Sequence, residues 1–188
     1  DWSLIENTIF SVCYDIEWSG YTWVAVGIGT SDTIAYSTNG ITWTGSGKTI
    51  FSTGGYGLGW NGNTLIAVGE GINSIAYSIE NADFVGIGSS IFSSAGYGVA
   101  WNGIRWVAVG LGTNTIAYSV NGINWFGIGN AIFSTSGNAV AGNSQVGAAI
   151  VESAIILDSK IFPKTSNLDV IGSQYYNEGY NNLSINIV

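Results

Sequence analysis

Short apolar segments, separated by Gly and Asn-Gly, recur along this chain. In one stretch they cover 97–101, 106–109, 116–119 and 123–128, each dense in β-branched and aromatic residues. This pattern predicts β-strands of about five or six residues that are joined by hairpins. The predicted two-residue hairpin turns are Asn39-Gly40, Asn61-Gly62, Asn102-Gly103 and Asn121-Gly122. The segment 106–109 is apolar at every position, so we expect strands that are covered on both faces.

The whole pattern repeats at intervals of 41 residues. Ile-Phe-Ser begins at Ile9, Ile50, Ile91 and Ile132, each 41 residues after the last. Ile-Ala-Tyr-Ser follows the same interval from Ile34 onward. Four strands of about five residues and their connections fill roughly 40 residues. Each repeat therefore predicts one four-stranded antiparallel unit.

Such units bury two apolar faces only by stacking against copies of themselves, and a ring of stacked sheets is a β-propeller. We expect an all-β propeller over 1–158, with four blades or as a fragment of a larger ring. The segment around Trp2 corresponds to the fourth strand of a repeat whose first three strands are missing, and 138–158 corresponds to the first three strands of a repeat without a fourth. Pairing the two would close a four-bladed ring. A solenoid of parallel coils is the alternative, but it predicts few hairpins. The segment 159–188 departs from the repeat and is predicted to be a C-terminal extension.

Two turn segments carry a family resemblance. Ser37-Thr38-Asn39-Gly40-Ile41-Thr42-Trp43 and its equivalent at 119–125 resemble the Asp-box, or sialidase-type, repeat of Ser, spacer, Asp, Gly and a closing aromatic, with Asn in place of Asp. The resemblance implies a structural box between the third and fourth strands of each propeller blade. The wider repeat also resembles uncharacterised repeat proteins of giant DNA viruses.

Composition removes several classes of function. Twelve acidic and four basic side chains give a net charge of −8, which disfavours a nucleic acid partner. With no His and one Cys the usual zinc and haem ligand sets are missing, and one carboxylate, at Asp32, is too few for calcium. We expect no metal and no cofactor. The longest apolar stretch, 139–157, is interrupted by polar residues, so no membrane insertion is expected. The chain begins at Asp1 without Met, which predicts a processed product or part of a longer protein.

Catalytic patterns are not recognised in this sequence. The resemblance to sialidases implies an arginine cluster, yet Arg105 is the single arginine. Asp15 and Glu17, like Glu80 and Asp83, are interpreted as solvated turn or edge positions, so a glycoside hydrolase relative is a distant alternative. The tryptophans and tyrosines follow the repeat, and we interpret them as packing between blades. These include Tyr14, Tyr56 and Tyr97.

Repeated polar loops are the candidate ligand site. The connections between second and third strands are small and polar, and the residues predicted to bind a ligand there are Thr30, Asp32, Asn73, Ser74, Thr113 and Asn114. They suit a neutral glycan, although ordinary hairpin turns use the same residue types. The leading prediction is a non-catalytic structural or attachment module whose partners are protein neighbours in an assembly, at a virion surface or extracellular. A lectin-like module is the alternative.

Overall fold

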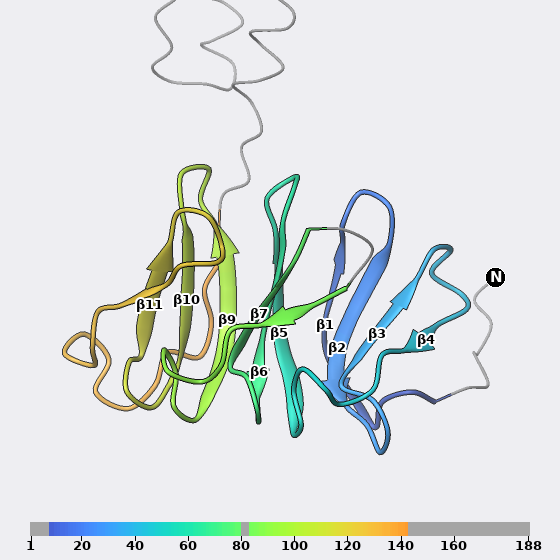
Figure 1. Cartoon of the computed structure of the whole chain (residues 1–188), viewed down its shortest axis with the longest axis horizontal. Coiled ribbons are helices and arrows are strands. Elements are labelled where there is room, and N and C mark those ends of the chain that lie inside the picture. Colours follow the sequence, from blue (N-terminus) through green and yellow to red (C-terminus); the bar gives the residue numbers. More distant parts are fainter. Residues whose placement is uncertain (1–7, 80–82, 143–188) are drawn as a thin grey trace, which may run out of the picture. The chain divides into compact units, whose positions relative to one another are not determined.

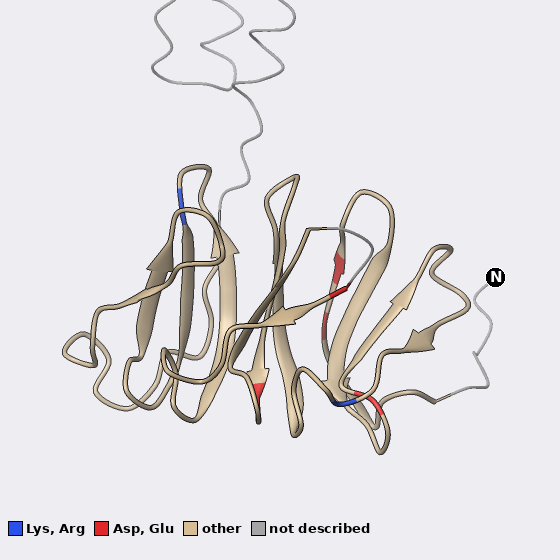
Figure 2. Ribbon diagram, in the orientation of Figure 1, with Lys and Arg blue, Asp and Glu red and all other residues tan. Residues whose placement is uncertain are grey.

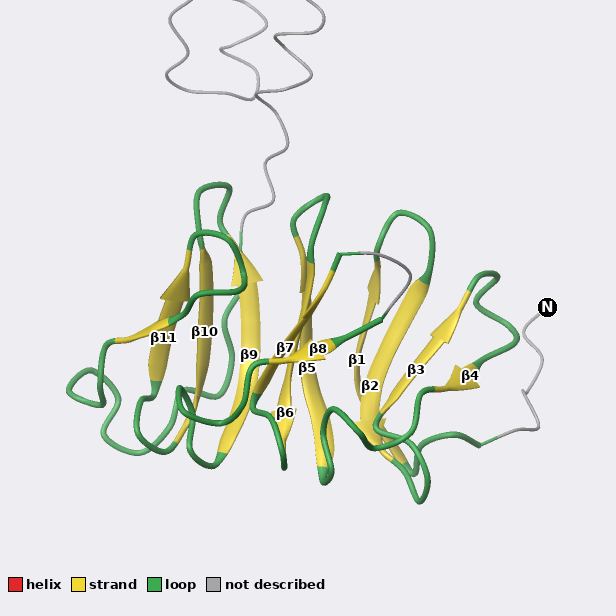
Figure 3. Cartoon of the chain, in the orientation of Figure 1, coloured by secondary structure: helices red, strands yellow, loops and turns green. Residues whose placement is uncertain are grey.

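The computed structural model describes residues 8–79 and 83–142. The chain divides into two compact parts, and the described residues belong to the first of them, Asp1–Ser144. This described part consists of strands and loops without a helix (Figure 3). The prediction of an all-β, antiparallel fold is therefore confirmed. The predicted boundary between 158 and 159, and the strand around Trp2, lie outside the described residues.

Three four-stranded antiparallel units follow one another along the chain (Figure 1). Unit 1 contains β1 (Val12–Trp18), β2 (Trp23–Ile28), β3 (Ile34–Ser37) and β4 (Thr44–Gly45). Unit 2 contains β5 (Gly54–Trp60), β6 (Leu65–Glu70), β7 (Ile75–Ser78) and β8 (Val85–Gly86). Unit 3 contains β9 (Ala95–Trp101), β10 (Trp106–Leu111), β11 (Ile116–Ser119) and β12 (Phe126–Gly127). Each fourth strand has two residues, fewer than predicted.

Units 2 and 3 share one sheet, whereas unit 1 forms its own. The pairing of Glu70 with Ala95 connects β6 to β9 and produces an eight-stranded sheet. This sheet is strongly curled into a half-barrel. The first strands β1, β5 and β9 lie next to one another in chain order.

The core lies between the units. One buried cluster combines Val24 and Ile34 of unit 1 with Leu58 and Leu65 of unit 2. The other combines Ile66 and Ile75 of unit 2 with three residues of unit 3, which are Val99, Trp106 and Trp125. Each unit is too thin to have a core of its own, so its apolar side chains become buried only against a neighbour. The prediction of a strand covered on both faces is confirmed for β6, where 65–69 are all buried, whereas Val107 in the segment 106–109 is half-buried.

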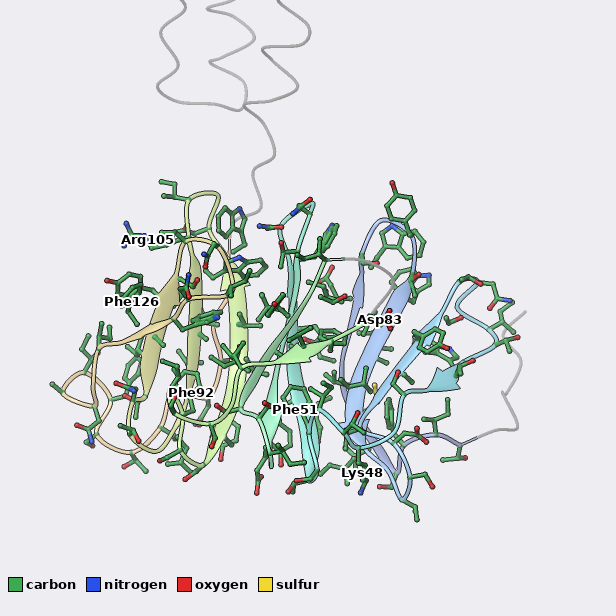
Figure 4. All side chains as sticks on the ribbon, viewed as in Figure 1. Lys48, Phe51, Asp83, Phe92, Arg105 and Phe126 are labelled. Carbon is green, nitrogen blue, oxygen red and sulfur yellow. The ribbon has the colours of Figure 1, made fainter. Side chains whose placement is uncertain are left out.

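The Ile-Phe-Ser segments connect one unit to the next. Phe51 is fully buried, and its backbone carbonyl accepts a 2.7 Å hydrogen bond from the hydroxyl of Thr33 in the preceding unit. The Phe51 ring lies so close to Gly69 that a side chain at position 69 would overlap it. Phe92 lies in the same way against Gly110 of unit 3, and both rings lie at the same end of the strands (Figure 4). The 41-residue recurrence of Phe and Gly therefore reflects one contact that is repeated in each unit.

The predicted two-residue hairpins are wrong. The first and second strands of units 2 and 3 are joined by four residues, Asn61–Thr64 and Asn102–Arg105. The Asn61 side-chain oxygen accepts hydrogen bonds from the backbone N–H groups of Asn63 and Thr64, and this Asx turn organises the longer loop. Position 62, which follows Asn61, is a glycine because its φ of 96° is a backbone conformation that other residues rarely adopt.

The box segments form the same turn in units 1 and 3. The Ser37 hydroxyl accepts from the N–H of Gly40 at 2.9 Å, and the Trp43 indole donates to the Gly40 carbonyl at 3.2 Å. In unit 3 the distance from Gly122 N to the Ser119 hydroxyl is also 2.9 Å. The turn is closed by its own side chains, which explains why Ser, Asn, Gly and Trp recur together.

Candidate functional site

The candidate ligand loops lie one in each unit, between the second and third strands. Thr30 and Thr113 are exposed, whereas Asn73 and Ser74 are buried. Asp32 and Asn114 are half-buried. Each pair of residues stays in its own loop. None of the six lines the hollow that lies against Tyr14, Tyr56 and Tyr97.

The amide side chains in these loops already have partners within the chain. The Asn73 Oδ1 accepts from the Gly88 N–H and its Nδ2 donates to the Ile50 carbonyl, both at 2.8 Å. Asn114 makes the equivalent pair of bonds in unit 3. Asp32 accepts from the Gly47 N–H at 2.7 Å. These side chains connect the residues just before each third strand to the loop after the fourth strand. Glycan binding by the loops stays a prediction.

One apolar surface of unit 1 has no covering unit among the described residues. Ile16 is 49% exposed, while its repeat equivalents Leu58 and Val99 are each 5% exposed. Trp23 is 38% exposed, and its equivalent Trp106 is completely buried. We call the surface formed by Ile16 and Trp23 the open face.

Unit 3 presents the opposite end of the stack. Ser136 pairs with Leu111, and the Gly137 N–H donates to the Gly110 carbonyl at 3.0 Å. A Cβ on Gly137 would contact Val109, as one on Gly96 would contact Val68 of unit 2. The segment 136–140 therefore begins to pack on unit 3 as β9 packs on unit 2.

Three tyrosines form a row across the first strands. Tyr14, Tyr56 and Tyr97 each occupy the extra position at a register shift between the first and second strands. A β-bulge redirects the side chain of its extra residue. The Tyr14 and Tyr56 ring centroids are 5.2 Å apart, and those of Tyr56 and Tyr97 are 5.7 Å apart. We call these three residues the tyrosine row.

A carboxylate supports the central ring. The Tyr56 hydroxyl donates a 2.8 Å hydrogen bond to Glu70 Oε2. Burial and this contact with Glu70 raise the pKa of the Tyr56 phenol, so the hydroxyl keeps its proton. The sequence predicts that these tyrosines pack between blades, and the structure adds a bond from Tyr56 to a carboxylate. Tyr14 is half exposed.

The Asp15 interpretation also needs correction. Rather than a solvated edge group, Asp15 accepts a 2.9 Å hydrogen bond through Oδ2 from the Leu58 N–H of unit 2. Neighbouring Glu17 is half-buried, and burial raises the pKa of its carboxyl. Both carboxylates therefore lie in a packed environment that strand alternation did not indicate.

The sequence carries one signal for the tyrosine row. Tyrosine recurs at the equivalent positions 14, 56 and 97, and the fourth equivalent position is Asn138. A residue that recurs for packing inside a strand and one that recurs at a bulge look the same in a sequence. Only the register of the pairing distinguishes them.

Comparisons with known proteins found no match for this chain, either among protein-family models or among curated proteins. Within residues 8–79 and 83–142 no helix is long and apolar enough to cross a membrane. The same residues contain no group of three or more His, Cys, Asp or Glu side chains that could hold a metal ion.

Proposed function

We propose that this chain is a non-catalytic β-propeller module that acts in structure or attachment, with protein neighbours as its partners. The observation that carries this proposal is the open face. Ile16 and Trp23 are exposed in unit 1, although the same repeat positions are buried wherever a preceding unit is present. An apolar surface of this kind is a site for a further unit.

The order of the strands supports the propeller. In a propeller the first strands of successive blades surround a common axis, and β1, β5 and β9 lie next to one another in this order. The unit-to-unit contact is used between units 1 and 2, between units 2 and 3, and again at 136–140. A contact that repeats with one rotation either closes into a ring or continues as an open stack.

The neighbour that best fits the open face is another copy of the repeating unit. The surface that covers Val99 and Trp106 comes from unit 2, where Gly59 lies against the Trp106 ring. A copy from the same chain would complete the ring, and a copy from a neighbouring molecule would join two molecules. Both arrangements are structural uses of the same contact.

The carboxylates support the non-catalytic part of the proposal. Asp15 accepts a hydrogen bond from a backbone N–H, and Glu70 accepts one from Tyr56. Each therefore has a defined packing role in the strands. A place at a virion surface or outside a cell is a prediction from the resemblance.

Ile16→Glu tests the proposal by placing a charge on the open face. The control is Ile104→Glu, because Ile104 is 73% exposed in a hairpin loop. If a neighbour in the same chain covers Ile16, the variant loses about 2 kcal/mol or more in the free energy of unfolding. If another molecule covers it, the native mass falls to that of a single chain, 19.7 kDa. If both variants match the parent in mass and stability, the open face has no partner and the proposal is wrong.

A further inference from the structure

An open hollow of about 470 Å³ lies against the tyrosine row, with Ser136 and Asn138 completing its lining. This volume is in the range of sites for small molecules. The hollow is built from the first strands of three units and the start of the next segment.

The three rings form walls instead of a flat platform. The planes of Tyr14 and Tyr56 meet at 82°, and those of Tyr56 and Tyr97 at 47°. A sugar ring stacks best on a single flat aromatic face. Rings that turn from one to the next instead suit a compact, rounded group that touches several faces at once.

The electronic character of the rings favours a cation. The face of an aromatic ring is negative, and it attracts cations within about 6 Å of its centre. Because the Tyr56 hydroxyl donates to the Glu70 carboxylate, the central ring gains electron density. The same molecule already places a cation over a tyrosine, since the Arg105 guanidinium lies 5.5 Å from the Tyr118 ring centre.

The surrounding charge favours a cation as well. The described residues carry five acidic side chains and two basic ones, Lys48 and Arg105 (Figure 2). The whole chain has a net charge of −8. A field of this sign raises the local concentration of cations.

We propose that the tyrosine row binds a quaternary ammonium ion, such as the trimethylammonium group of choline or of trimethyllysine. The methyl groups contact the faces of Tyr14, Tyr56 and Tyr97. Ser136 and Asn138 supply hydrogen-bonding groups for the substituent that the ammonium carries. A tightly hydrated primary ammonium is a poorer ligand because it would lose its water on entering the hollow.

Isothermal titration calorimetry of the whole chain tests this site with four probes. Choline and trimethyllysine carry the cation, dimethylbutanol is the neutral carbon isostere of choline, and glucose represents neutral sugars. We expect the two cations to bind at least ~10-fold more tightly than the isostere. A preference for choline would point to a headgroup, and a preference for trimethyllysine to a modified protein; either supports the proposal.

Variants show whether the rings are responsible. Tyr14→Leu is the main variant because Tyr14 is half exposed, so the fold tolerates the change. It should weaken choline binding by ~10-fold. Tyr56→Phe keeps the ring but loses the bond to Glu70, and a smaller loss is expected. Tyr21→Leu is the matched control, because Tyr21 is 82% exposed in a hairpin loop, and it should leave binding unchanged.

Three results would overturn the proposal. The first is that choline does not bind, or binds no better than dimethylbutanol. The second is that glucose binds in its place, which would make the row a sugar site. The third is that Tyr14→Leu and Tyr21→Leu bind choline equally, which would place the binding elsewhere.

Discussion

The carboxylate of Asp15 accepts a 2.9 Å hydrogen bond from the backbone N–H of Leu58, 43 residues later and in the next unit. The repeat equivalents of Asp15 are Gly57 and Gly98, so this bond exists only between units 1 and 2. It adds a second polar connection, besides the Thr33–Phe51 hydrogen bond, at an interface whose buried side chains are mainly apolar.

Asp15→Ala should destabilise the protein. The change removes the acceptor for the N–H of buried Leu58, and such a loss costs about 1–3 kcal/mol in the free energy of unfolding. Asp15→Asn keeps an acceptor oxygen and serves as the control. Urea unfolding measures both variants. Equal stability of the Ala and Asn variants would show that the bond contributes nothing.

Asn73→Asp should destabilise unit 2 through its loop. Asn73 Nδ2 donates to the Ile50 carbonyl, whereas a carboxylate would place an acceptor against that carbonyl. We expect a loss of about 1–3 kcal/mol by urea unfolding. Asp32→Asn is the matched reverse change in unit 1 and should alter stability by less than about 0.5 kcal/mol. A similar loss in both variants would contradict this role of the amide.

Gly110→Ala should be among the most damaging single-methyl changes. The added methyl would overlap the Ala95 carbonyl oxygen and the buried Phe92 ring, so the interface between units 2 and 3 would have to shift. Overpacking of this kind costs about 1–3 kcal/mol or more. Gly103→Ala is the control, because that glycine has open space around it and a φ of 93°. Its cost should be about 1 kcal/mol, from backbone strain alone. Thermal or urea unfolding that ranks Gly103→Ala as the worse variant would show that the close approach is unimportant.

Glu17 should make stability depend on pH in an uncommon direction. Burial raises the pKa of its carboxyl, and the charge of Asp15 adds to this, while the Trp18 N–H acts in the opposite sense. The folded state therefore binds the proton more tightly than the unfolded state does. The free energy of unfolding should fall as pH rises from the ordinary carboxyl pKa through the raised one.

Glu17→Gln removes this dependence. The stability advantage of the variant over the parent should grow between about pH 4 and pH 7, as followed by urea unfolding at each pH. A constant difference between the two proteins across this range would mean that the Glu17 pKa is the same in both states.

The sequence alone determined the strands, their antiparallel order and the stacking of repeats. Ile116–Ser119 was located at its observed bounds, and the 41-residue interval reports contacts such as Phe92 against Gly110. These features are readable because each follows from residues within one repeat and is then copied. A period in the sequence is a direct record of a contact that occurs once per unit.

Only the tertiary structure decided which recurring residues are buried and which face outward. Ile16 and Leu58 are equivalent in the repeat, yet one is exposed and the other buried, because burial depends on the neighbouring unit. The bulges that turn Tyr14, Tyr56 and Tyr97 into one row arise from the pairing register, and Asp15 reaches Leu58 only because the units stack. The contacts between these tyrosines and the bond from Leu58 to Asp15 depend on packing between segments about 40 residues apart in the chain, which the local pattern of apolar and polar residues does not specify.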